Sequence, residues 1–154
     1  MTTALFVGRF QPLHKGHAYA LKHLLKRNKL IIAIGSTNKT GTENPFTFQE
    51  RKSMLDAVLR KKKNRCRIIG AADYKSDRKW SSAIERRAKF DFIVTGNPWV
   101  KRCFRSYKSV KPRLLKQNVY NASRIRVLIR KNKNWQTYVP KEIITIVEKH
   151  FSRQ

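Results

Sequence analysis

The sequence predicts an α/β fold: a single Rossmann-like, doubly wound domain with a mostly parallel sheet and helices on both faces. Three observations predict it. Short apolar segments rich in β-branched residues recur along the chain, each ends in or next to Gly or Ser, and helix-length amphipathic segments separate them. This alternation is typical of parallel strands joined by right-handed crossovers. We expect one domain over residues 1–154, with a carboxyl-terminal helical part from about residue 120.

The apolar segments have the length and composition of buried parallel strands. The predicted strands are TALFVG (3–8), LIIAIGS (30–36), CRIIGA (66–71) and FDFIVTG (90–96). In a doubly wound sheet the ligand crevice lies beyond the carboxyl ends of the strands. The loops that follow these four segments are therefore the first place to look for functional residues.

The spacers between the strands have helical periodicity. The predicted helices are residues 16–27, 48–62 and about 79–88, and the first two place apolar residues such as Leu21 and Leu55 along one face. Residues 97–119 are expected to form a polar helix and a short edge strand at RLLK (113–116). Two later helices are predicted, one over 121–132 that is capped by Ser123 and one over 140–151 that begins at Pro140.

Composition restricts the class of protein. The chain has 36 Lys and Arg against 9 Asp and Glu, a net charge of +27, which favours phosphate-rich partners. Its two cysteines, Cys66 and Cys103, have neither zinc-site nor disulfide-framework spacing. No apolar run reaches the roughly 18 residues that cross a bilayer, and the amino terminus does not resemble a secretion signal. We expect a soluble cytoplasmic protein with no membrane partner and no metal-ligand cluster.

The stretch GRFQPLHKGH (8–17) links the first predicted strand to the first helix. Gly8 ends the strand, and the helix amino end offers unpaired N–H groups that suit a phosphate. His14 and His17 are three residues apart, so their rings can point at one anion. Arg9 adds a forked donor and Gly16 allows close approach. The stretch contains neither G-x-G-x-x-G nor the P-loop pattern, which argues against both of those sites.

These residues resemble the H-x-G-H loop of nucleotidylyltransferases, and the G-R-F-Q-P form resembles the archaeal-type nicotinamide-nucleotide adenylyltransferases. Three further stretches are similar to that family in the same order along the chain. They are IGSTNKTGTENPFTFQER (34–51), TGNPWV (95–100) and YNASRIRVLIRKNKNWQTYVP (120–140). The resemblance implies that the protein joins ATP to nicotinamide mononucleotide, giving NAD and pyrophosphate, with Mg²⁺ accompanying ATP.

The resemblance also implies roles for particular residues. The implied catalytic residues, which contact the ATP phosphates, are His14, His17 and Arg126. The implied ATP site comprises Gly8, Arg9, Phe10, His14, Gly16, His17, Asn97, Ser123 and Arg126. The implied mononucleotide site comprises Asp73, Asp77 and Trp80, with the tryptophan stacked on nicotinamide. The alternative interpretation of Trp80 is a core residue, and that of Asn97 is a turn residue. Without the resemblance, Arg126 is interpreted as part of a solvated basic helix.

Some positions depart from the family pattern and leave alternatives open. Asp77 stands where the family usually has Asn, and NAS (121–123) stands where it usually has S-G-T. Asp77 would repel an acidic analogue, which favours the amide mononucleotide over its acid. The alternatives are adenylyl or cytidylyl transfer to another phosphate acceptor, and a basic nucleic-acid-binding protein that uses the runs at 60–67 and 101–116. The resemblance also implies that the protein forms a homo-oligomer, specifically a hexamer.

Overall fold

In the computed structural model, which describes residues 1–153, five parallel strands form one sheet in the order β3-β2-β1-β4-β5. The strands are β1 (Thr3–Gly8), β2 (Lys29–Ile34), β3 (Cys66–Gly70), β4 (Phe92–Val94) and β5 (Ser109–Val110). The chain adds β2 and β3 on one side of β1 and then returns to place β4 on its other side. The carboxyl ends of β1 and β4 therefore flank the point where the winding reverses, and this is where an open α/β sheet binds its ligands.

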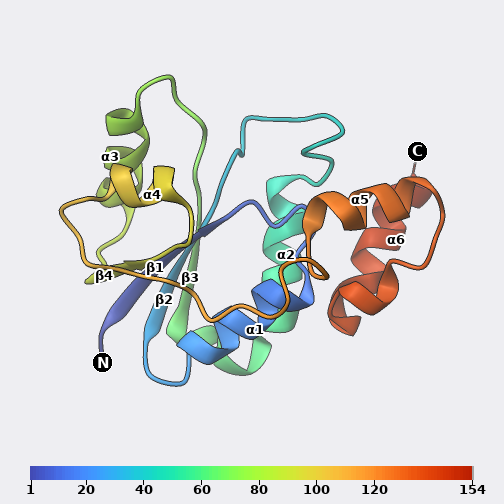
Figure 1. Ribbon diagram of the computed structural model, residues 1–154, viewed down its shortest axis with the longest axis horizontal. Coiled ribbons are helices and arrows are strands. Elements are labelled where there is room, and N and C mark those ends of the chain that lie inside the picture. Colours follow the sequence, from blue (N-terminus) through green and yellow to red (C-terminus); the bar gives the residue numbers. More distant parts are fainter. Residues whose placement is uncertain (154) are drawn as a thin grey trace.

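Helices cover both faces of the sheet, as predicted (Figure 1). They are α1 (Lys15–Leu24), α2 (Phe48–Val58), α3 (Asp77–Arg87), α4 (Pro98–Cys103), α5 (Ala122–Arg130) and α6 (Ile144–Ser152). Short 3₁₀ segments are η1 (Arg60–Arg65), η2 (Gln136–Tyr138) and η3 (Lys141–Ile143). Figure 1 shows α3 and α4 on the left of the strands and the other four helices on the right.

Alternation along β1 separates two hydrophobic cores. Ala4 and Phe6 face the layer that contains α1, α2, α5 and α6, whereas Leu5 faces α3 and α4. Trp80 of α3 and Phe104 belong to the second core, where they are 2% and 1% exposed. Because both faces of the central strand are buried, it reads as a continuous apolar run in the sequence.

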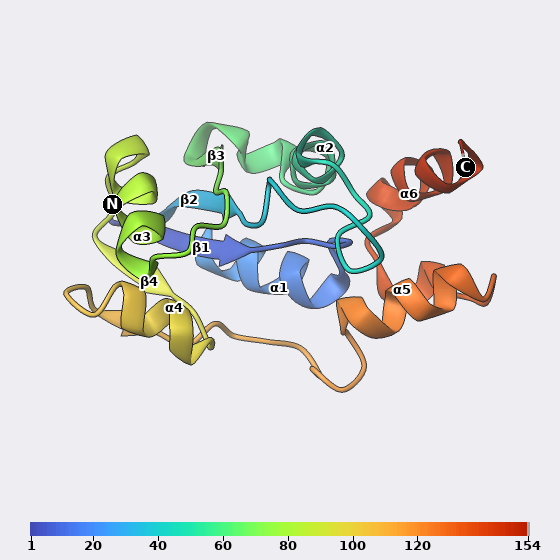
Figure 2. The same ribbon diagram turned by 90° about the horizontal axis from the view of Figure 1, so that it is seen from above.

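The carboxyl-terminal helices lie beyond the end of the sheet, far from the amino terminus (Figure 2). Both views show the segment from α4 to α5 running along the molecule as a mostly irregular connection. This segment carries Tyr120 to the amino end of α1, where its Cβ lies near Gly16. The connection thus brings residues from the last third of the chain to the first loop.

Three predicted elements are wrong in detail. The edge strand is Ser109–Val110, not 113–116, because Pro112 has no N–H with which to extend the pairing. The predicted polar helix is confined to Pro98–Cys103, since the backbone of Phe104 leaves the helical region and its ring enters the core. The cap of α5 is Asn121, whose side chain accepts the N–H of Arg124 at 3.2 Å, so Ser123 lies inside the helix.

The predicted helix over 48–62 ends early. After Val58 the chain tightens into η1, in which Lys62 departs from helical geometry. η1 has the sequence RKKKNR, and like charges three or four residues apart destabilise a helix. The cationic run at 60–65 is therefore presented on a short, exposed turn rather than on a regular helix face.

Candidate functional site

Two histidines cap the first helix. His14 is the N-cap of α1, and His17 is its third residue. The backbone N–H of His17 donates to His14 Nδ1, and the backbone N–H of His14 donates to His17 Nδ1, each at 3.3 Å. The two rings stack with centroids 3.6 Å apart. This reciprocal arrangement is a capping box in which imidazoles replace the usual hydroxyl and carboxylate.

The caps fix the protonation of both rings. Because each Nδ1 accepts a hydrogen bond, a neutral ring must carry its proton on Nε2. Burial lowers the pKa of His14 to about 4. Burial, and then the neighbouring His14, lower the pKa of His17 well below its usual value. At neutral pH the pair is therefore two uncharged Nε2–H donors rather than two cations.

Close packing around the rings explains the glycines of this loop. A Cβ on Gly16 would lie 2.9 Å from His14 Cε1, and one on Gly8 would lie 2.8 Å from the ring of Phe10. Phe10 has a φ of 52°, and its buried ring meets that of His17 edge-on at 4.9 Å. Phe10 thus packs against the ring of His17, and the absence of a Cβ at Gly8 and Gly16 leaves room for the rings of Phe10 and His14.

Arg126 reaches the same place from α5 and is only 2% exposed. One terminal nitrogen donates to the carbonyl of Gln11 at 2.8 Å. The other donates to Glu43 Oε2 at 2.6 Å and to the Ser123 hydroxyl at 3.1 Å. Its Nε is buried and has no hydrogen-bond partner among the described residues. A buried N–H without a partner is costly, and here it marks a position that an additional acceptor would stabilise.

A second buried arginine supports the first loop. Arg51 of α2 is 1% exposed and donates to the carbonyls of Arg9 at 2.9 Å and Gly35 at 2.6 Å. Burial, with Arg9 nearby, lowers its pKa to about 10, so it remains charged at neutral pH. By holding the backbone of Arg9, it leaves the guanidinium of Arg9 exposed at the crevice, where it contacts Asn44 Oδ1 at 3.4 Å.

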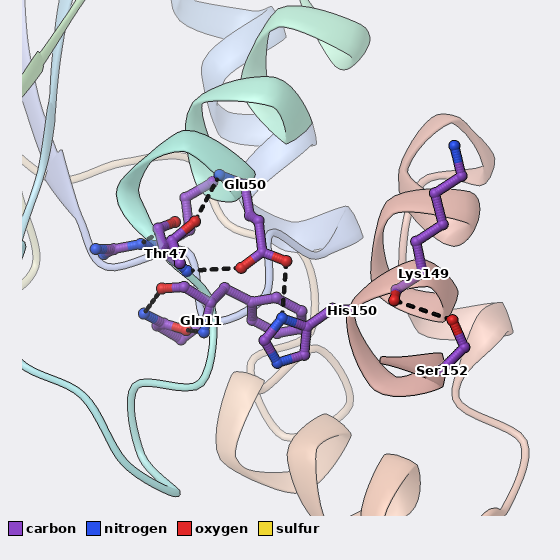
Figure 3. Close-up of polar contacts among 8 residues, drawn as sticks. Gln11, Thr47, Glu50, Lys149, His150 and Ser152 are labelled. Atoms are coloured by element: carbon purple, nitrogen blue, oxygen red, sulfur yellow. Dashed lines mark hydrogen bonds and ion pairs between the residues drawn. The ribbon is translucent and has the colours of Figure 1, made fainter. Parts of the chain in front are cut away.

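The last helix is tied to the same loops (Figure 3). His150 Nδ1 lies 2.7 Å from Glu50 Oε2, and the other oxygen of Glu50 accepts the N–H of Thr47. Burial alone would raise the pKa of Glu50, but the Thr47 N–H and His150 outweigh it and lower the value. Beside them, the Gln11 amide makes two hydrogen bonds with the backbone of Phe46. The α2 end of the loop between β2 and α2 is thus fixed on the first loop and on α6.

Two adjoining cavities open at the carboxyl ends of β1 and β4. The larger, of about 620 Å³, extends toward the connection before α5, and the smaller, of about 360 Å³, extends toward β2 and α3. The wall that they share contains Val7, Arg9, His14, His17, Thr95, Asn97, Ala122 and Arg126. Every basic or imidazole side chain that lines either cavity is in this shared wall.

The predicted site residues divide between the two cavities. Gly16 and Ser123 line the larger one, and Gly8, Phe10, Asp73 and Trp80 line the smaller one. Asn97 lines both and also caps α4, because its side chain accepts the N–H of Trp99 at 2.9 Å. Asp77 lines neither cavity. It faces a separate hollow beside Arg102, and its carboxylate accepts the indole N–H of Trp99 at 2.9 Å.

Trp80 combines both readings of the sequence. It is 2% exposed and packs against Phe104, as a core tryptophan does, but its edge lines the smaller cavity. Trp99 lies against it with ring centroids 4.4 Å apart and is the more accessible of the two rings. Asp73 also lines the smaller cavity, and its carboxylate accepts the hydroxyl of Ser36 at 2.8 Å.

Sequence reasoning did not single out Glu43, Arg51 or Trp99. Arg51 and Glu43 lie within the stretch 34–51 that carries the family resemblance, but nothing in their spacing distinguishes them from the other charged residues. Trp99 had a stronger signal, since it directly follows Asn97-Pro98 at the start of a helix. No set of three metal-ligating side chains is gathered anywhere in residues 1–153. In the same residues, no helix has the length and apolarity to span a bilayer.

The chain is similar to a known protein family over nearly its whole length. Residues 5–146 match the family model described as cytidylyltransferase-like. The chain is 36% identical over 157 residues to the nicotinamide-nucleotide adenylyltransferase of Pyrococcus furiosus, covering 96% of this chain and 84% of that protein. It is 33% identical over 152 residues to the protein of the same name from Thermococcus sibiricus, covering 94% of this chain and 82% of that protein.

A solved structure has the same fold. It is the bifunctional NMN adenylyltransferase/ADP ribose pyrophosphatase from Francisella tularensis, complexed with AMP and a manganese ion. The TM-score is 0.79 at 27% identity, and the match covers 90% of this chain and 44% of that one. The predicted Rossmann-like fold class is therefore confirmed.

Proposed function

This chain belongs to the nicotinamide-nucleotide adenylyltransferases of the cytidylyltransferase-like family, and we propose that its paired cavities bind ATP and nicotinamide mononucleotide with their phosphates at the shared wall. The reaction is adenylyl transfer: an oxygen of the mononucleotide phosphate attacks the α-phosphorus of ATP. The bond to the β-phosphate breaks, and NAD and pyrophosphate are formed.

The observation that carries this proposal is the position of the polar groups. Two cavities meet at one wall, and that wall holds Arg9, both histidines and Arg126. Two nucleotides that react through their phosphates need the same arrangement, with separate pockets for the bases and common donors for the phosphates. The larger cavity suits ATP because Gly16 and Ser123 extend it along the amino ends of α1 and α5.

The chemistry needs positioning rather than a general base. The attacking phosphate oxygen is already ionised at neutral pH, so catalysis depends on alignment and on neutralising charge in the transition state. The Nε2–H groups of His14 and His17 donate to oxygens of the α-phosphate. The Nε of Arg126, which has no acceptor within residues 1–153, donates to the departing pyrophosphate. Fixed donors of this kind stabilise charge where it develops, without reorganisation.

The triphosphate must compete with one protein carboxylate. Glu43 holds a terminal nitrogen of Arg126 at 2.6 Å, and the Glu43 side chain is 62% exposed. Phosphate oxygens that bind Arg126 take the place of this carboxylate, which is free to turn into solvent. Mg²⁺ enters with ATP as part of the substrate, since no cluster of metal ligands is found in residues 1–153.

The smaller cavity suits the mononucleotide. Trp99 supplies an accessible aromatic face for the pyridinium ring, Trp80 supports it from the core, and Asp73 lines the same cavity. Asp77 acts indirectly, by holding the indole N–H of Trp99. Its role is therefore positioning rather than direct recognition of the substrate.

Product analysis tests the proposal. The protein is incubated with Mg²⁺-ATP and nicotinamide mononucleotide, and NAD and pyrophosphate are quantified. Parallel reactions offer nicotinic acid mononucleotide, phosphopantetheine or flavin mononucleotide as acceptor, and CTP as donor. Formation of NAD as the preferred product supports the assignment, whereas no NAD together with turnover of another pair overturns it.

Matched variants test the site. His17→Ala should lower kcat by about 10²- to 10³-fold, the usual loss when one fixed donor is removed. The control is His23→Ala, because His23 lies later on α1, lines neither cavity and stacks on Tyr19. For α5, Arg126→Gln is compared with Arg130→Gln, since Arg130 is exposed at the end of the same helix. Equal losses in a variant and its control would remove the proposed roles.

A further inference from the structure

A large basic cavity lies away from the proposed active site, on the side where α1 and α2 end. Its volume is about 710 Å³, and its lining is Lys22, Lys26, Ala57, Val58, Leu59, Arg60, Lys61, Lys62 and Glu142. None of these residues lines the paired cavities described above. The adenylyl-transfer reaction leaves this feature unexplained.

Within residues 1–153, none of the cationic side chains of this cavity forms an ion pair with a carboxylate. Lys22 lies on α1, Lys26 lies in the turn that follows α1, and Arg60, Lys61 and Lys62 belong to η1. All five are exposed. Among residues 1–153 the ion pairs of Lys and Arg involve Lys52, Arg102 and Arg126 instead. Glu142 is the single acidic residue in the lining. A cluster of this kind repels itself and attracts polyanions.

The floor of the cavity is apolar. It is formed by Ala57, Val58 and Leu59, at the point where α2 passes into η1. Cationic walls around an apolar floor match a ligand that alternates phosphates with flat, weakly polar groups. Single-stranded nucleic acid has this chemistry, because its unpaired bases can unstack and bury one face against the protein. An inorganic phosphate chain would use the walls but not the floor.

The other basic run of the sequence has a different environment. Residues 101–116 contain Phe104 and Tyr107, which suit base stacking in the sequence, but Phe104 is 1% exposed and the Tyr107 hydroxyl donates to Glu85. The hollow on that side includes Asp77, which pairs with Arg102. The run at 101–116 also contributes Arg105 to a hollow, but there Asp77 pairs with Arg102, whereas none of the five cations in the η1 lining forms an ion pair within residues 1–153.

We propose that this cavity, which we call the η1 cavity, binds single-stranded nucleic acid as a second function of the protein, independent of adenylyl transfer. Phosphates lie against Lys22, Lys26 and the η1 cations, and a base covers Leu59. Because no aromatic residue lines the cavity, binding is expected to depend strongly on salt and weakly on sequence.

The test measures binding of a fluorescent oligouridylate of about 20 nucleotides, long enough to exceed one site. Fluorescence anisotropy is followed between about 0.05 and 0.2 M NaCl, where electrostatic binding changes steeply. The test variant replaces Lys22, Lys26, Lys61 and Lys62 with Gln. The control replaces the same number of exposed lysines on the α3 and α4 side, namely Lys79, Lys89, Lys101 and Lys108, also with Gln.

If the η1 cavity is the site, the test variant raises Kd about tenfold or more. It also makes the slope of log K against log salt shallower by up to about 2.8, which is about 0.7 for each of four lost phosphate contacts. The control should change Kd much less, although both variants lose the same charge. Melting temperature and NAD synthesis are measured in parallel and should match the wild-type protein in both variants, so that misfolding is recognised.

Three results would overturn the proposal. One is the absence of detectable binding by the wild-type protein at low salt. Another is an equal loss in the test and control variants, which would assign binding to net charge alone. The third is equally tight binding of a duplex of the same length, or of inorganic polyphosphate, which would show that the apolar floor is not used.

Discussion

Replacing Glu43 with Gln should tighten the binding of ATP. In the free protein the carboxylate of Glu43 lies 2.6 Å from a terminal nitrogen of Arg126, an arginine that lines the wall shared by the two cavities. A phosphate oxygen that binds this terminal nitrogen must displace the carboxylate. The amide keeps the shape of the side chain but has no charge, so it competes less well with the triphosphate.

The size of the effect follows from exposure. Arg126 is buried, but the Glu43 side chain is 62% exposed, so solvent screens the pair. Exposed ion pairs typically contribute about 0.2–1 kcal/mol, and we use the upper value here because Arg126 itself is buried. If this contribution is lost from the free state alone, the Kd for ATP falls about fivefold, since 1.4 kcal/mol corresponds to a factor of ten.

The assay is titration calorimetry with α,β-methylene-ATP, which binds without transferring its adenylyl group. Removing one acidic residue also raises the net charge, so the control is Glu148→Gln, an exposed position on α6 that lines neither site cavity. The control should change Kd by much less than fivefold, because screening weakens distant charges. Weaker ATP binding by Glu43→Gln would refute the reasoning and show that Glu43 positions Arg126 for its substrate.

Three further outcomes are expected. Folding should become less stable as the pH falls from about 6.5 to 4, because the native state holds His14 neutral with a pKa of about 4. The loss of stability is up to about 3 kcal/mol. Melting temperatures should fall less with pH in His14→Asn, which keeps a capping side chain but has no imidazole to protonate. Gly16→Ala should lower kcat, because the added Cβ would lie only 2.9 Å from His14 Cε1 and would push the ring out of place. A higher melting temperature with full activity, as helix propensity alone predicts, would contradict this. Trp99→Leu should raise KM for nicotinamide mononucleotide about tenfold, the loss of one stacking contact, and a change confined to the KM for ATP would assign the ring to the other substrate.

The sequence predicted the layered fold because each buried strand is a short apolar run that ends near a glycine or serine. It also predicted that His14 and His17 share one side of a helix end, since a spacing of three residues brings side chains together there. Helix ends were less predictable. Asn121 and Ser123 are both good caps, and only the backbone of the folded chain shows that Asn121 is the one used.

Long-range contacts were beyond the reach of local pattern. Glu43 meets Arg126 across 83 positions, and Arg51 holds the carbonyl of Arg9 across 42. In a chain with 36 basic residues, nothing local distinguishes the two arginines that become buried. The same limit applies to Asp77, whose carboxylate accepts the indole N–H of Trp99 across 22 positions.

The charge of the chain gives the uncharged imidazoles a particular significance. A protein of net charge +27 attracts a triphosphate from every side, so attraction by itself distinguishes neither substrate from product nor one phosphate from another. Catalysis requires interactions that are stronger in the transition state than with ATP or pyrophosphate. Neutral Nε2–H donors provide direction without adding charge that would retain pyrophosphate. In the proposed mechanism, Glu43 offers Arg126 another acceptor when pyrophosphate leaves. Both features oppose product retention, so we expect this site to bind its phosphates less tightly than the number of cations around it implies.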